Sequence, residues 1–138
     1  MPLLEVTDQP SESDLSIIGD GISAYNDEDI GPSPRKSLAV LIRDENGRII
    51  GGLSGRTGWG WLFIQYLFVP EHLRGQGLAG KLLTRAEEEA RARGCHGAWI
   101  DTFNPQALRA YRRQGYEIFG ELPDYPPGRT RSFLRKRL

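Results

Sequence analysis

One short segment of the sequence combines three glycines with an arginine: Arg74-Gly75-Gln76-Gly77-Leu78-Ala79-Gly80. Glycine lets a ligand approach the backbone closely and permits conformations that a side chain disfavours. The apolar stretch from Trp59 to Val69 before it predicts a buried strand, and the apolar spacing after it predicts a helix over 78–93. The amides of a helix's first turn, at the positive end of its dipole, hold anions such as phosphate. The segment therefore predicts a phosphate-binding loop between a strand and a helix.

Two well-known phosphate-binding motifs can be compared with this loop. A P-loop needs Ser or Thr after Gly80-Lys81, and Leu82 has no hydroxyl group, so the P-loop is excluded. The dinucleotide pattern G-x-G-x-x-G is present as Gly75, Gly77 and Gly80, with Asp101 at a suitable distance for a ribose hydroxyl. However, residues 70–74 separate the strand from the first glycine, and only 37 residues follow Asp101. An oxidoreductase that binds NAD or NADP through these four residues is kept as an alternative.

A third motif fits better. The pattern R-x-x-G-x-A, formed by Arg74, Gly77 and Ala79 after Val-Pro-Glu, resembles the acyl-CoA-binding signature of the GNAT superfamily of N-acetyltransferases. The following segment of that family is also matched, by Asn104, Ala107, Tyr111, Gly115 and Tyr116. The resemblance extends over nearly the whole chain in the order of its elements and is most specific over 67–116.

The resemblance implies a mixed α/β (α+β) fold with one N-acetyltransferase domain over 1–138. Its centre would be a mixed, mostly antiparallel sheet of six to seven strands, flanked by about four helices, with a splayed strand pair forming the acyl-CoA cleft. The patterns of the sequence predict an N-terminal strand, then helices over 14–25, 78–93 and 104–115, and strands over 38–43, 48–54, 59–69, 98–103, 116–122 and 131–138.

The same resemblance implies acetyl-CoA as the acyl donor and assigns residues to it. The backbone of Leu67 and Val69 would pair with the pantetheine arm, and the Val69 amide would also polarise the thioester carbonyl. The pyrophosphate would be held by the backbone amides of the loop: Arg74, Gly75, Gln76, Gly77, Leu78, Ala79 and Gly80. Asn104 is explained equally well as a helix N-cap and as a pantetheine contact.

Tyr111 is the predicted catalytic residue. A tyrosine at such a helical position is more often a core residue, but the resemblance implies that it protonates the departing CoA thiolate and also contacts the cofactor. The chemistry is sound, because a phenol with a pKa of about 10 can donate to a thiolate with a pKa of about 8.5 when it is held in place.

The acceptor implied by the resemblance is a primary amine that attacks the thioester directly. A protonated amine must first lose a proton. Family members often carry a Glu on the strand over 59–69, and this chain has none there, so Asp101, a water chain and His72 stay open as bases. The acceptor pocket is expected to involve the acidic N-terminal region, Trp59 with Trp61, and Tyr125. The missing Glu keeps a non-catalytic acyl-CoA sensor as a further alternative.

Composition limits the remaining classes. Cys95 is the only cysteine and His72 and His96 are the only histidines, which argues against a disulfide framework and against a metal site, so we expect no metal. Residues 1–34 hold eight acidic and no basic side chains, leaving eighteen basic and ten acidic side chains in the rest. We expect no membrane span, because the longest apolar run is too short, and no secretory signal. We also expect no nucleic-acid partner, because the basic stretch 129–138 suits an edge strand with its charges outward, and one short basic strand is weak evidence for such a partner. The expectation is a cytoplasmic enzyme acting on a small-molecule or peptide amine, which the resemblance also suggests pairs into a homodimer.

Overall fold

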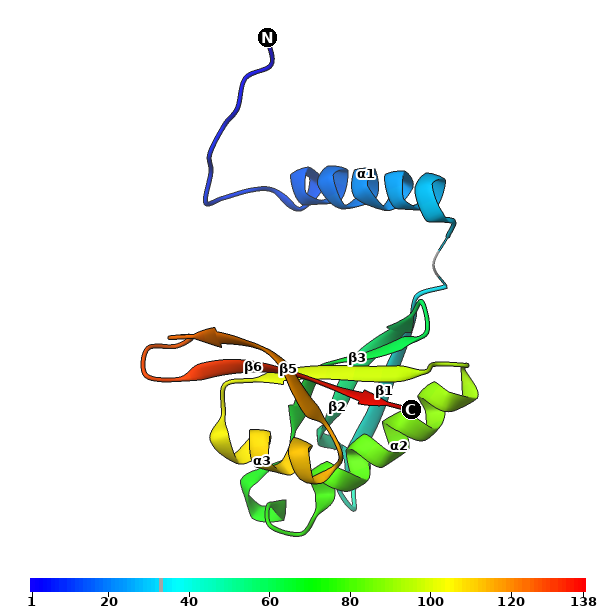
Figure 1. Cartoon of the computed structure of the whole chain (residues 1–138), viewed down its shortest axis with the longest axis vertical. Coiled ribbons are helices and arrows are strands. Elements are labelled where there is room, and N and C mark those ends of the chain that lie inside the picture. The colour runs from blue at the N-terminus through cyan, green and yellow to red at the C-terminus, as the bar shows by residue number, and fades with distance from the viewer. Residues whose placement is uncertain (33) are drawn as a thin grey trace. The chain divides into compact units, whose positions relative to one another are not determined.

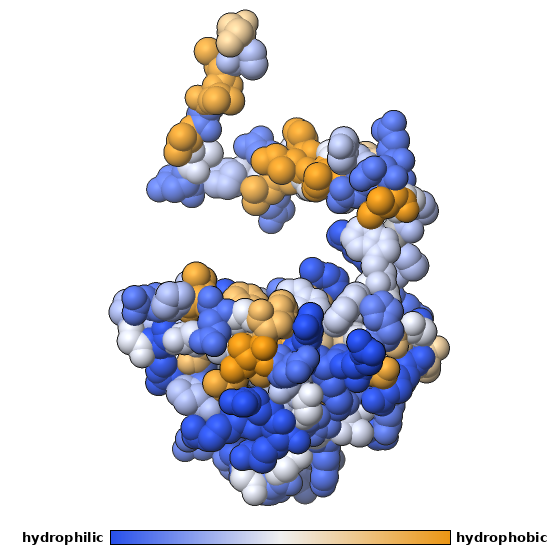
Figure 2. Space-filling model, in the orientation of Figure 1, coloured by the Kyte–Doolittle hydropathy of each residue, from blue (hydrophilic) through white to orange (hydrophobic). Residues whose placement is uncertain are grey.

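The computed structural model describes residues 1–32 and 34–138, and contacts divide the chain into one unit up to residue 33 and a second unit, Pro34–Leu138. The first unit contains helix α1 (Glu12–Ile30) (Figure 1). A capping box begins it, in which the Ser11 hydroxyl and the Asp14 carboxylate each accept the other residue's backbone amide. No residue of α1 is buried, and apolar side chains lie on its surface (Figure 2).

The predicted N-terminal strand is wrong, because residues 1–10 form neither helix nor strand. Strands are stable only where a neighbour pairs with them. Helix α1 is also longer at both ends than the predicted range of 14–25. Its interior glycines lower helix propensity without ending the helix.

The second unit is built on one six-stranded sheet. Its neighbours run in the order β1-β2-β3-β4-β6-β5, with β3 and β4 parallel and every other adjacent pair antiparallel. The mixed, mostly antiparallel sheet is therefore confirmed. The strands are β1 (Lys36–Arg43), β2 (Ile49–Gly58), β3 (Trp61–Phe68), β4 (Gly97–Thr102), β5 (Glu117–Pro123) and β6 (Thr130–Arg137).

Two α-helices, α2 (Leu78–Ala92) and α3 (Pro105–Arg113), cover the same face of this sheet (Figure 1). With α1 they make three α-helices in the described residues, to which the short 3-10 helix η1 (Glu71–Leu73) adds one turn. The buried residues of α2 follow helical spacing and pack on alternate residues of the strands. This core includes Leu53, Leu62, Ile64, Leu82, Leu83, Ala86, Ala90, Ala98, Ile100 and Leu134.

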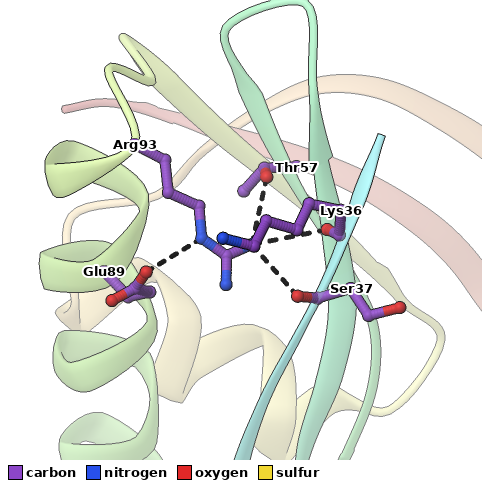
Figure 3. Close-up of polar contacts among 5 residues, drawn as sticks. All are labelled: Lys36, Ser37, Thr57, Glu89 and Arg93. Carbon is purple, nitrogen blue, oxygen red and sulfur yellow. Dashed lines mark hydrogen bonds and ion pairs between the residues drawn. The ribbon is translucent and has the colours of Figure 1, made fainter. Parts of the chain in front are cut away.

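Arg93 ties the end of α2 to the first two strands (Figure 3). Its Nε donates to the Glu89 carboxylate at 2.9 Å, and its Nη1 lies 3.0 Å from the Ser37 carbonyl and 3.2 Å from the Thr57 hydroxyl. A second polar link lies on the same helix, where the carboxylate of buried Glu87 accepts from the Tyr116 hydroxyl and from Lys136 Nζ, both at 2.7 Å. These contacts fix the position of α2 on the sheet.

The basic stretch at the C-terminus forms an interior strand, so its interpretation as an edge strand is wrong. Strand β6 pairs with β4 on one side and with β5 on the other. Its alternate residues Ser132 and Leu134 are buried under the helices, which leaves Arg131, Phe133 and Arg135 on the other face of the sheet.

Candidate active site

The cleft of the second unit opens where two parallel strands separate. Strands β3 and β4 pair from Trp61 and Gly97 as far as Ile64 and Ile100, and beyond those residues both strands continue unpaired with each other. A bulge coincides with this point: Ser54 of β2 faces Tyr66 and Gly55 faces Ile64, so Gln65 has no partner. The structure thus contains the splayed strand pair that the sequence predicts.

The walls of this cleft come from both strands, from the glycine loop and from α3. Its volume is about 940 Å³. Ten of the eleven predicted cofactor residues line it, namely Leu67, Val69, Arg74, Gly75, Gly77, Leu78, Ala79, Gly80, Asn104 and Tyr111, whereas Gln76 is exposed and does not. The tertiary structure therefore brings together residues that lie up to 44 positions apart in the sequence.

The glycine loop presents the N-terminus of α2 to the cleft. Gly77 is the N-cap with a left-handed φ of 73°, and no side chain caps the helix. The first turn also contains no acidic side chain, so its amides and the positive end of the dipole meet no competing anion from that turn. Gly75 has a φ of 80° as well, which explains why glycine is favoured at both positions.

Arg74 has a positioning role that sequence reasoning missed. Its Nε donates to the Val69 carbonyl at 2.8 Å. The side chain therefore bends back onto the end of β3 and links the loop to that strand. Arg74 still lines the cleft, where its guanidinium adds positive charge near the start of α2.

Asn104 is the N-cap of α3. Its side-chain oxygen accepts from the Gln106 amide at 2.9 Å and from the Ala107 amide at 3.0 Å. The capping interpretation is thus confirmed. The cap uses the side-chain oxygen of Asn104 and not its NH2 group. The pantetheine contact stays a prediction.

Tyr111 lies on α3 with 6% of its surface exposed, packed in the core and lining the cleft at the same time. Burial, and then the negative charge of Asp101, raise the pKa of its phenol to about 12. The hydroxyl is therefore protonated at neutral pH, as a proton donor to a thiolate must be. Tyr111 is therefore both a core residue and a cleft residue, although the sequence analysis treated these two roles as alternatives.

Asp101 carries the only carboxylate among the residues that line the cleft in the described chain. Its Oδ1 accepts from Arg131 Nε at 2.9 Å and lies 2.8 Å from a terminal guanidinium nitrogen of the same residue. The Arg131 guanidinium in turn lies 5.1 Å from the centre of the Tyr125 ring. Sequence reasoning missed Arg131, since its pairing with β4 spans 30 residues and leaves no local signal.

Three other residues that the sequence analysis names do not line this cleft. Trp61 begins β3, whereas the cleft opens beyond Ile64, so the Trp59 and Trp61 end of the strand does not line it. His72 is exposed on η1 and is likewise absent from the cleft walls. The exposed aromatic residues that do line the cleft are Tyr66, Phe68, Phe103 and Tyr125.

The chain belongs to the acetyltransferase (GNAT) family, whose model matches residues 10–116. It is an acyltransferase enzyme of that family. Among curated proteins it is 47% identical over 135 residues to acetyltransferase Atu2258 of Agrobacterium fabrum, covering 98% of this chain and 96% of that protein. It is 41% identical over 106 residues to the blasticidin-S acetyltransferase of Streptomyces morookaense, covering 76% and 78% of the two proteins. A crystal structure of an acetyltransferase from Agrobacterium tumefaciens superposes with a TM-score of 0.95 at 45% identity, covering 100% of both chains.

The family and the fold both disfavour the dinucleotide alternative. That fold repeats parallel strand–helix–strand units, whereas β3 and β4 are the only parallel neighbours in the described sheet. No helix of the described residues is long and apolar enough to cross a membrane.

Proposed function

We propose that this enzyme transfers the acetyl group of acetyl-CoA to the primary amine of a small molecule. The observation that carries this proposal is a single cleft that combines a splayed strand pair, an uncapped helix N-terminus and a buried protonated tyrosine. The donor binds along β3, with its pantetheine arm against the backbone of Leu67 and Val69. Its pyrophosphate lies on the amides of residues 74–80, and Asn104 contacts the pantetheine from the other wall.

The reaction is a direct displacement at the thioester carbonyl carbon. The amine nitrogen forms a bond to that carbon, the carbon–sulfur bond breaks, and the Val69 amide stabilises the negative charge that develops on the oxygen. Tyr111 donates its phenolic proton to the departing thiolate. An acceptor bound as an ammonium loses one proton to solvent before the attack, and its nitrogen loses a second proton as the amide forms. Asp101 is the candidate to accept this second proton, because its Oδ2 is not the oxygen that Arg131 occupies.

The acceptor side supports a small molecule that carries a cationic amine. Tyr66, Phe103 and Tyr125 present aromatic surface that is 47% to 67% exposed, and Asp101 supplies a nearby negative charge. Aromatic faces and a carboxylate both attract an ammonium group before it is deprotonated. A relative's name, blasticidin-S acetyltransferase, identifies a small-molecule acceptor for that protein and supports the same class here. An intracellular location stays a prediction of the sequence.

The test is an assay of free CoA release with acetyl-CoA and a panel of small amines, amino acids and peptides. We expect turnover with at least one small amine, and Tyr111→Phe should lower kcat by about 100-fold while the affinity for acetyl-CoA is retained. Tyr25→Phe, which changes a tyrosine on α1 in the same way, should keep the activity.

Thermal unfolding with each candidate ligand separates the alternatives. Saturating acetyl-CoA or CoA should stabilise the protein, and NAD and NADP should not. Stabilisation by acetyl-CoA without acetylation of any amine would identify a sensor instead of an enzyme. Full activity of the Tyr111→Phe variant would remove that residue from the mechanism.

A further inference from the structure

Helix α1 carries an apolar stripe that nothing in its own unit covers. Leu15, Ile18, Ile22 and Tyr25 follow one another at intervals of three, four and three residues, which places them on one helix face. Their exposed fractions are 54%, 69%, 54% and 66%. Among the described residues up to 32, α1 is the only helix or strand. An apolar stripe of this kind is typical of a helix that packs against a partner surface.

The sheet of the second unit has a face that suits such a helix. Helices α2 and α3 cover one face, and the residues between the buried strand positions point to the other. Phe63 and Trp99 stack there with ring centres 4.1 Å apart, and Phe119 is 50% exposed. This surface, together with Trp61 and Phe133, is called here the open sheet face.

The charges of the helix and of the open sheet face are opposite. Arginine guanidinium groups lie over its rings, with Arg56 at 4.9 Å from Phe63 and Arg135 at 5.4 Å from Phe119. The stripe of α1 ends at Asp29, four residues after Tyr25 on the same face, and the chain has no basic residue before Arg35. Complementary charge favours docking of an acidic helix on an apolar surface bordered by arginines.

The linker favours docking on another molecule. Only five residues, 31–35, join α1 to β1, and Pro32 and Pro34 are two of them. Proline fixes its own φ, so a five-residue sequence with two prolines can adopt few conformations. Short hinges promote the exchange of an element between copies.

The comparisons indicate that α1 is part of the domain that the family shares. The family match begins at residue 10, and the Agrobacterium fabrum relative aligns over 98% of the chain, so both include the helix. A helix that belongs to the shared domain, and that is not an added tail, is expected to complete a packed surface.

We propose that α1 of one copy packs its apolar stripe on the open sheet face of a second copy, which returns its own α1 in the same way. The result is a two-fold symmetric dimer that exchanges its N-terminal helices. The proposal concerns the assembly of the chain and does not rest on the proposed acetyl transfer.

Sedimentation of the full chain over a wide concentration range tests the assembly. We expect the wild type to sediment at twice the monomer mass of 15.5 kDa. Ile22→Glu places a charge in the stripe of both helices and should weaken the dimer at least about 100-fold. Ala24→Glu, on the opposite side of the same helix, should leave it intact. Circular dichroism of each variant shows whether the second unit is folded, since its core contains no residue of α1.

Cross-linking identifies the surface and the copy that α1 contacts. The variant with both Ile22→Cys and Arg56→Cys is treated with a short bis-maleimide, and buried Cys95 is the only native thiol. The expected product has the mass of two chains, and Ala24→Cys in place of Ile22→Cys should reduce its yield. A cross-link within one chain, a wild type that is monomeric at every concentration, or a dimer unaffected by Ile22→Glu would each overturn the proposal.

Discussion

Arg131 on β6 holds the carboxylate of Asp101 on β4 through a single oxygen, with two guanidinium nitrogens 2.8 and 2.9 Å from Oδ1. The two residues lie side by side because β4 and β6 are antiparallel neighbours, with Asp101 paired to Phe133 and Thr102 to Ser132. The arrangement leaves Oδ2 without a contact to Arg131, and this oxygen is the one that we propose as the proton acceptor. It also places a fixed negative charge near the hydroxyl of Tyr111.

The first prediction concerns this carboxylate as a proton acceptor. Asp101→Asn keeps the size of the side chain and a carbonyl oxygen for Arg131 but removes the base. We expect kcat to fall about 100-fold, with little change in the KM for acetyl-CoA. Steady-state kinetics at saturating amine measures this effect. Glu117→Gln, which changes an exposed carboxylate in a 3.7 Å ion pair with Arg135, is the matched control and should be neutral. An active Asp101→Asn enzyme would point to water as the base.

The second prediction separates backbone conformation from contact at the glycine loop. A methyl group on Gly77 meets no atom within 4 Å, so Gly77→Ala causes no clash, but its φ of 73° is unfavourable for alanine. A strain of roughly 1–2 kcal/mol should shift the loop and weaken acetyl-CoA binding about 10-fold. Isothermal titration with acetyl-CoA measures the change.

Gly47→Ala is the control for strain alone. Gly47 has a φ of 80° with open space around it, and it lies in the turn between β1 and β2, away from the cleft walls. The Gly47→Ala variant should lose a similar amount of free energy of unfolding and keep the wild-type affinity for acetyl-CoA. Equal losses of affinity in both variants would contradict the assignment of the loop.

The third prediction is a loss of stability at high pH caused by Tyr111. Below pH 10 the phenol is protonated in the folded and the unfolded chain. Between pH 10 and its folded pKa of about 12, the unfolded chain has lost the proton and the folded chain keeps it, so the free energy of unfolding falls as the pH rises. The loss is up to about 3 kcal/mol for a shift of this size.

Urea unfolding across this pH range, for the wild type and for Tyr111→Phe, measures the contribution. The variant should lose less stability between pH 10 and 12. Tyr116, whose pKa is also raised by burial, by Glu87 and by Tyr111, is present in both proteins, so its contribution cancels except for the part that Tyr111 causes. Parallel curves for the two proteins would show that the phenol ionises equally easily in both states.

The fourth prediction concerns the attachment of α2 through Arg93. Arg93→Ala removes the donors that reach Ser37, Thr57 and Glu89, and should lower the free energy of unfolding by about 2 kcal/mol. Arg93→Lys keeps the charge but lacks the planar fork and should recover only part of this. Arg91→Ala, an exposed change two residues away, should stay within about 0.5 kcal/mol of the wild type in thermal unfolding. A neutral Arg93→Ala would mean that water replaces these contacts.

Much of the fold was predictable because its signals are local. The apolar run of β3, the four-residue repeat of α2 and the Asn-Pro start of α3 each depend on neighbours within a few positions. The structure contains these elements within a few residues of the predicted ranges. The prediction of an N-terminal strand was wrong because a strand needs a partner strand, which can lie far away in the sequence. The same dependence explains why β6 lies inside the sheet although its charges suggested an edge.

The family, the glycine loop at the start of α2 and the candidate acid Tyr111 can all be predicted from the sequence. Which residues share the cleft with them depends on how the elements pack. The pairing of β3 with β4 ends at Ile64 and Ile100. The cleft that opens beyond this point is lined by Asp101, Arg131 and Tyr125 as well as by the loop. Likewise, the burial that raises the pKa of Tyr111 comes from helix and strand packing together. These properties depend on contacts across long sequence separations, which the spacing of residues along a chain does not encode locally.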